Sequence, residues 1–201
     1  MRIAVLDDHQ DCVRGLACFT RLEGHEVLVL HETLTDPDAL AARLGGVEAL
    51  VLIRERTKIT AALLDRLPSL RLVSQTGRHG PHIDLEACKA RGIVVAIGKG
   101  SPHAPAELTW ALVLAAMRGV AHESAALRAG RWQTMLGRTV RGKTLGVLGY
   151  GNIGKLVAGY GRAFGVKLLA HGREGTRARA ATDEIECAST QRELFERSDW
   201  P

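Results

Sequence analysis

Short apolar runs alternate with amphipathic segments along the first half of the chain. The runs predict five β-strands, at residues 2–6, 26–30, 49–53, 70–74 and 93–96. The segments between them predict helices at 39–44, 61–67 and 85–91, which Asp36, Thr60 and Asp84 cap. Because strand alternates with helix, the pattern predicts a parallel sheet with helices on both faces.

A stretch rich in glycine and proline, residues 98–102, interrupts this alternation. One long helix is predicted after it, from Ala104 to about Arg128. Residues 111–116 are apolar on every face of that helix, which is typical of burial against another domain or a partner subunit. We therefore place a domain boundary near residue 100, and we expect a homodimer to form through the helix that begins near Ala104.

The second half of the chain contains the motif G-x-G-x-x-G between an apolar strand and a helix, and a further strand at 166–170 follows it. The motif consists of Gly149, Tyr150, Gly151, Asn152, Ile153 and Gly154. Its glycines permit a tight turn, close approach of the backbone to phosphate, and close packing of helix on strand. The free N–H groups and dipole of the helix start favour an anion. The motif predicts a dinucleotide pyrophosphate site, the alternative being a structural turn.

Composition limits the other function classes. The chain of 201 residues is 46% hydrophobic and 24% charged, as in ordinary globular proteins. Its longest apolar run is too short to cross a bilayer, and its start has no secretory pattern, so we expect a cytoplasmic protein without membrane contact. The four cysteines lack metal or disulfide spacing. The net charge of +5 comes from dispersed basic residues, which favours an anionic cofactor and substrate over nucleic acid.

Three stretches resemble the D-isomer-specific 2-hydroxyacid dehydrogenases, the family of phosphoglycerate, formate and glycerate dehydrogenases. They are QTGRHGPHIDL at 75–85, PAELTWAL at 105–112, and RGKTLG at 141–146, which leads into the glycine motif. The resemblance implies an α/β protein with a flavodoxin-like parallel-sheet substrate domain, residues 1–100, followed by the first part of a Rossmann NAD(P)-binding domain, residues 101–201. It implies hydride transfer between NAD(P) and a 2-hydroxy or 2-keto acid.

The resemblance also implies that backbone N–H groups of Arg78, His79 and Gly80 hold the substrate carboxylate, an anion site of the nest type. His79 and His82 stand where glycine and asparagine are common in the family, and both can instead be surface residues of a loop. Their spacing lacks a third ligand nearby, so no metal is predicted. Arg54 follows the third strand at the edge where open α/β sheets bind ligands, and is a further candidate. The alternative for Arg54 is a solvated turn.

Cofactor choice depends on the residues that end the second strand of the nucleotide domain. Gly172 occupies the family's usual position for the acid that binds the ribose hydroxyls of NAD. Arg173 can accommodate the 2′-phosphate of NADP, whereas Glu174 can serve as the acid instead. We therefore expect NAD as the family default, with NADP as the alternative.

The predicted Rossmann domain has strands for only its first half when the sequence reaches Pro201. In the family, the catalytic arginine, glutamate and histidine follow later. The resemblance therefore implies a truncated member whose catalytic residues lie beyond Pro201, and no catalytic residue is assigned within the chain. The alternative function is a non-catalytic dinucleotide-binding protein, similar to the transcriptional corepressors that use the same scaffold.

Overall fold

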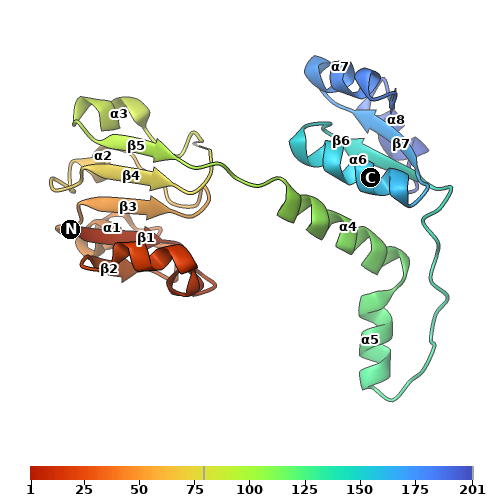
Figure 1. Ribbon diagram of the computed structural model, residues 1–201, viewed down its shortest axis with the longest axis horizontal. Helices are drawn as coiled ribbons and strands as arrows, with labels where there is room; N and C mark the ends of the chain where they lie inside the picture. Colours follow the sequence, from red (N-terminus) through yellow and green to blue (C-terminus); the bar gives the residue numbers. More distant parts are fainter. Residues whose placement is uncertain (79, 201) are drawn as a thin grey trace. The chain divides into compact units, whose positions relative to one another are not determined.

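A computed structural model describes residues 1–78 and 80–200 of the chain. The chain divides into two compact units, Met1–Gly100 and Ser101–Pro201 (Figure 1). None of the helices in the described residues is long and apolar enough to cross a membrane.

The first unit contains a five-stranded parallel sheet with the order β2-β1-β3-β4-β5. Its strands are β1 Arg2–Leu6, β2 Glu26–Val29, β3 Ala49–Leu52, β4 Leu72–Gln75 and β5 Val94–Ile97. This is the strand order of flavodoxin-like sheets. All five predicted strands are confirmed, with ends that differ from the prediction by two residues or fewer.

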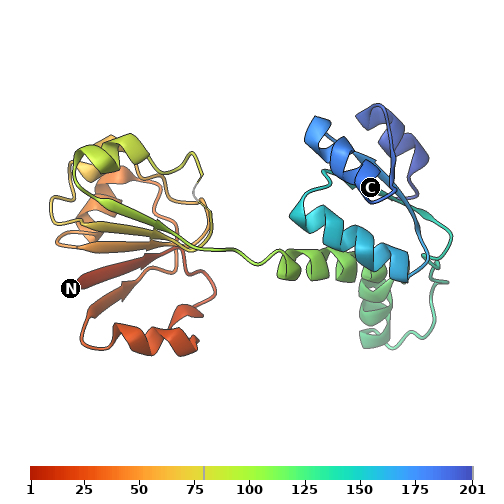
Figure 2. The same ribbon diagram turned by 45° about the horizontal axis from the view of Figure 1, so that its top comes forward.

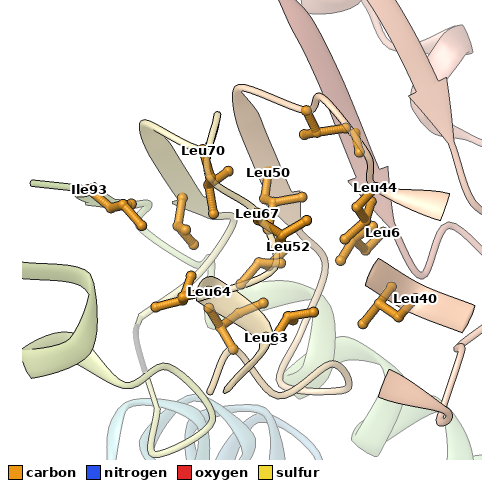
Figure 3. Packing of buried hydrophobic residues seen from close by; sticks show 14 of the residues in the cluster. Leu6, Leu40, Leu44, Leu50, Leu52, Leu63, Leu64, Leu67, Leu70 and Ile93 are labelled. Atoms are coloured by element: carbon orange, nitrogen blue, oxygen red, sulfur yellow. The ribbon is translucent and has the colours of Figure 1, made fainter. Parts of the chain in front are cut away.

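Three α-helices of this unit cover one face of the sheet. They are α1 Pro37–Arg43, α2 Ala61–Leu64 and α3 Leu85–Ala90. The side chains of the predicted caps Asp36, Thr60 and Asp84 accept hydrogen bonds from the backbone of the first turns. The helices share one apolar cluster with strand residues of a single face (Figure 3), including Leu6, Leu40, Leu44, Leu50, Leu52, Leu63 and Leu64.

The crossover from β1 to β2 differs from the prediction of α-helices on both faces. It consists of two 3-10 helices, η1 Val13–Gly15 and η2 Ala17–Leu22, which bury no residue. The apolar residues of this segment, among them Val13, Leu16 and Phe19, remain at least partly exposed.

The second unit contains the parallel strands β6 Thr144–Leu148, β7 Lys167–His171 and β8 Glu186–Cys187, in that order. Helices α6 Asn152–Ala163, α7 Glu174–Thr182 and α8 Gln191–Arg197 alternate with them. Trp200 forms a parallel bridge to Leu145, whose other side pairs with β7. With Trp200 beside β6, the order matches the first four strands of a Rossmann sheet.

The helical segment before this sheet is broken, so the prediction of one helix from Ala104 to Arg128 is wrong. It forms α4 His103–Met117 and α5 Val120–Arg128, and Gly119 between them has a φ of 64°. A left-handed residue cannot continue a right-handed helix. Helix α4 packs along α6 (Figure 2), where the rings of Trp110 and Phe164 lie 5.0 Å apart.

Candidate functional sites

The glycine loop joins β6 to α6 in the second unit. Gly149 has a φ of 89°, a conformation that residues with a Cβ rarely adopt. A Cβ on Gly154 would lie 2.3 Å from the carbonyl oxygen of Gly149 and 3.1 Å from Val147 Cγ1. The loop therefore requires glycine at Gly149 for its turn and at Gly154 for the contact of helix with strand, in agreement with the sequence prediction.

Gly151 has a different role, because it faces open space. It is the N-cap of α6, and a Cβ on it would meet none of the described atoms within 4 Å. The N–H groups of the first helical turn have no partner within the helix. An anion placed before α6 would therefore meet bare backbone and the positive end of the helix dipole. These residues fit a dinucleotide pyrophosphate, and the exposed side chains of Asn152 and Ile153 border that space.

Tyr150 anchors the loop rather than pointing into that space. Its side chain is 2% exposed, and its hydroxyl donates to Asp183 Oδ2 over 2.8 Å. Burial and this hydrogen bond raise the pKa of Tyr150 to about 12. The Tyr150 carbonyl accepts from Arg179 Nε over 2.9 Å. Because the hydroxyl and the carbonyl of Tyr150 are already engaged, the backbone N–H group is the part of Tyr150 that can contact a cofactor.

A pocket of about 740 Å³ lies beside the glycine loop, at the carboxyl ends of β6 and β7. Arg173, the N-cap of α7, is exposed at this pocket. The lining residues are Leu148, Gly149, His171, Gly172, Arg173, Gly175, Thr176, Arg177, Arg179 and Gln191. The predicted alternative acid, Glu174, is not among them. The pocket lies where a Rossmann fold binds the adenosine ribose.

In the first unit, a buried hydrogen-bond chain joins the loops that follow β3 and β4. Gln75 Nε2 donates to the carbonyl oxygen of Arg54 over 3.2 Å, and His82 Nε2 lies 3.1 Å from Gln75 Oε1. Because the amide NH₂ of Gln75 faces a carbonyl, its Oε1 must accept from His82. The proton of a neutral His82 therefore sits on Nε2.

The structure shows where the predicted substrate residues lie. Arg54 is exposed, with a φ of 62°, and Arg78 is exposed on the loop after β4. A Cβ on Gly80 would lie 3.4 Å from Glu55 Cγ, so the two loops that carry Arg54 and Gly80 are adjacent. His79 lies outside the described residues.

His82 is a residue that the sequence prediction underrated. The interpretation of both histidines as surface residues is wrong for His82, which is 7% exposed. Its Nδ1 has no hydrogen-bond partner among the described residues, and a Cβ on Gly80 would lie 3.1 Å from it. Its hydrogen bond to Gln75 gives it a positioning role for this loop.

Two aspartates after β1 were also missed. Asp7 has a φ of 63° and is buried, where its carboxylate accepts hydrogen bonds from Thr33 and Thr57. Burial acts to raise the pKa of Asp8, but hydrogen bonds from the backbone N–H groups of Val13 and Cys12 outweigh this effect, so the net direction of the pKa is down. Both carboxylates therefore serve to hold this loop together. Asp8 also lies near Asp11 and His31 in a group with metal-ligand spacing.

Comparison with known proteins extends this picture. Residues 110–200 match the family described as D-isomer specific 2-hydroxyacid dehydrogenase, NAD binding domain. A crystal structure from Ralstonia solanacearum, of a protein assigned as D-3-phosphoglycerate dehydrogenase, is 54% identical, with a TM-score of 0.92. The match covers 99% of this chain and 63% of that one.

Two curated relatives are also similar. D-3-phosphoglycerate dehydrogenase of Mycobacterium leprae is 38% identical over 82% of this chain and 31% of its own length. Hydroxypyruvate reductase of Thermotoga maritima is 35% identical over 68% of this chain and 45% of its own length. The chain thus spans less than half of the length of either relative.

A flavodoxin-like unit followed by a Rossmann-type unit with a glycine loop defines a dinucleotide-binding α/β protein. Within that class, the chain belongs to the D-isomer specific 2-hydroxyacid dehydrogenase family.

Proposed function

We propose that this protein is an oxidoreductase that transfers a hydride between a nicotinamide dinucleotide and a small 2-hydroxy or 2-keto acid. The observation that carries the proposal is the glycine loop, in which Gly151 leaves the start of α6 open to a phosphate. Names of the relatives, which include a hydroxypyruvate reductase, support this substrate class. A bound nicotinamide supplies the hydride chemistry itself.

The residues of this chain perform binding and orientation in this proposal. Backbone N–H groups at the start of α6 hold the pyrophosphate, and the pocket beside Arg173 holds the adenosine ribose. In the first unit, the loop of Arg78 and Gly80 holds the substrate carboxylate, with Arg54 as a second contact. Gln75 and His82 fix that loop from beneath.

A binding experiment tests the cofactor site directly. The chain is titrated with NADH and with NADPH, and Gly151→Val is compared with Gly159→Val. Gly159 lies in the same helix, and a Cβ there would also meet none of the described atoms within 4 Å. We expect binding by the original chain and by Gly159→Val, and none by Gly151→Val. Equal dissociation constants for the two variants would refute the site.

A second experiment separates the oxidoreductase from a non-catalytic binding protein. A chimera would carry residues 1–200 of this chain followed by the part of the Ralstonia relative that the match does not cover. We expect it to oxidise NADH or NADPH in the presence of hydroxypyruvate or glyoxylate. Cofactor binding without turnover on any 2-keto acid would favour the non-catalytic alternative.

We also propose a homodimer, formed through the apolar surface that begins on α4. Large apolar side chains are exposed along α4, α5 and the segment after them: Leu108, Leu112, Val120, Leu127, Trp132, Met135 and Leu136. Leu136 is 94% exposed, and patches of this kind mark interaction sites.

Sedimentation equilibrium tests the dimer, and we expect the original chain to sediment as one. The double variant Leu112→Asp with Leu136→Asp should be a monomer, whereas the control Leu16→Asp, on the first unit, should remain a dimer. A monomeric original chain would contradict the proposal. We further propose that the protein is located in the cytoplasm.

A further inference from the structure

The pocket beside the glycine loop is unusual in its charge. Three of its lining residues are arginines, namely Arg173, Arg177 and Arg179, and none of the described lining residues is an aspartate or a glutamate. We propose that this pocket selects the 2′-phosphorylated cofactor, NADP(H), with Arg173 as the residue that recognises the phosphate. This inference rests on the proposed dinucleotide site and names the form of cofactor that it takes.

The backbone at Gly172 leaves no room for a side chain. The position where relatives carry the acid that binds a plain ribose is Gly172 in this chain. A Cβ on Gly172 would lie 2.8 Å from Cβ, Cγ2 and Oγ1 of Thr176. Thr176 is buried and its side chain is short, so it cannot move aside easily. The space for a side chain at Gly172, and hence for a carboxylate there, is already filled.

The other nearby acid, Glu174, lies outside the pocket lining. Glu174 follows Arg173 in the first turn of α7, but it does not line the pocket. In this arrangement the Glu174 carboxylate is not among the groups that face a ribose bound in the pocket. The acid that ordinarily favours NAD and repels a 2′-phosphate therefore has no counterpart among the described residues of this pocket.

The three arginines of the pocket differ in whether their guanidinium groups are already engaged. Arg179 donates to the Tyr150 carbonyl over 2.9 Å, and Arg177 donates to the Ser189 carbonyl over 3.0 Å. The guanidinium of Arg173 makes no hydrogen bond or ion pair with any described residue, and it is exposed at the start of α7. Its fork of donors is free to bind a phosphate, for which a ribose hydroxyl is no substitute.

The electrostatics of the pocket point the same way. Arg177 and Arg179 keep their positive charges while they bind carbonyl oxygens, and the pocket lining offers no carboxylate to neutralise them. The nine-residue helix α7 directs its N-terminus toward the same place. A dianionic phosphate is thus favoured by several groups at once, and a neutral ribose hydroxyl by none of them.

Titration of the intact chain with NADPH and NADH, at low ionic strength and followed by ligand fluorescence, tests the proposal. We expect tighter binding of NADPH. Arg173→Ala should weaken NADPH binding about 10- to 100-fold, the effect of one charged hydrogen-bonding partner, and change NADH binding little. Arg128→Ala, an exposed arginine on α5 outside the pocket, is the matched control and should change neither.

Competition with 2′,5′-ADP and 5′-ADP measures the contribution of the 2′-phosphate alone, because neither nucleotide contains the nicotinamide. The proposal expects 2′,5′-ADP to compete better in the original chain, and to lose that advantage in Arg173→Ala. If both cofactors bind but NADH binds at least as tightly, or if Arg173→Ala leaves the ratio unchanged, the phosphate selectivity is wrong while the dinucleotide site stands. If no dinucleotide binds, the proposed function fails and this inference fails with it.

Discussion

At the scale of single residues, the structural roles of the motif glycines could be predicted from the sequence, whereas the burial of polar side chains could not. The roles of Gly149 and Gly154 follow from the local path of strand, turn and helix, which a motif specifies within a few residues. Burial of His82 depends on Gln75, which belongs to strand β4, and on the loop after β3, which is distant in sequence. No local pattern contains that information.

The buried pair of His82 and Gln75 gives a first prediction. His82→Leu should lower the free energy of unfolding by about 1–3 kcal/mol, because it leaves Gln75 Oε1 buried without a donor. Urea denaturation measures this change. His25→Leu, at an exposed histidine of the same unit, is the control and should have little effect. Equal stabilities of the two variants would show that water or another group satisfies Gln75.

The crowding at Gly172 gives a second prediction. Gly172→Ala should destabilise the chain by about 1–3 kcal/mol, the usual cost of overpacking, because its Cβ meets the Thr176 side chain. Thr176→Gly removes all three of the close atoms. In a double-mutant cycle, the two changes together should cost less than the sum of the single changes. Strictly additive costs would mean that Thr176 is not what fills this space.

At the scale of elements, the sequence predicted those with a strong apolar pattern or a cap. The strands of the first unit and the capped helices are of this kind. Helix α7 was missed because it buries only Thr176 and Ala180 and contains a glycine, so it has no apolar stripe. Strand β8 has two residues, too few to show a period. The break at Gly119 was missed because the apolar pattern continues across it.

Helix α8 gives a prediction for pH. Its cap Thr190 accepts from the N–H of Glu193, whose carboxylate accepts from the Ser189 N–H over 2.7 Å and pairs with Arg197. The Ser189 hydroxyl and Arg197 lower the pKa of Glu193 from 4.5 to about 2. Because the folded-state pKa is the lower one, this stabilisation is complete above about pH 4.5 and is lost as the pH falls toward 2.

Glu193→Gln should therefore lower the melting temperature near neutral pH, and the difference from the original chain should shrink as the pH falls through that range. Circular dichroism melts at a series of pH values measure both quantities. Glu196→Gln is the control, since Glu196 is on the same helix but, among the described residues, pairs only with Arg192, at 4.0 Å. A difference that does not depend on pH would mean that Glu193 acts without its charge.

At the scale of the whole molecule, the sequence predicted both sheets because each is built from local βα units that the motifs and apolar runs specify. It could not predict which surfaces remain exposed. The apolar pattern of α4 predicts burial, yet the side chains of Leu108 and Leu112 are each 60% exposed in this chain. A surface outside their own unit, of another domain or of a partner subunit, is needed to complete their burial, and no local pattern in the sequence specifies such a surface.

The division of labour between binding and catalysis gives the last prediction. The residues that we assign to cofactor and substrate contacts lie within the 201-residue chain, whereas the resemblance identifies none of its histidines as the general acid of the reaction. Positioned proton transfer contributes about 10²–10⁴ in rate, and stabilisation of the keto oxygen a comparable factor. We therefore expect the purified chain to bind a nicotinamide dinucleotide and to show no turnover of hydroxypyruvate, glyoxylate or 2-ketobutyrate.

The control for that assay is Gly151→Val, which removes cofactor binding without touching any histidine. Turnover by the original chain above this control would contradict the prediction and would assign proton transfer to a residue within it. His103 would be the first to substitute, because it is exposed at the start of α4. His82 would be a poor second choice, since its Nε2 proton is committed to Gln75 and its ring is buried. Loss of turnover in His103→Gln with unchanged cofactor affinity would then identify the acid.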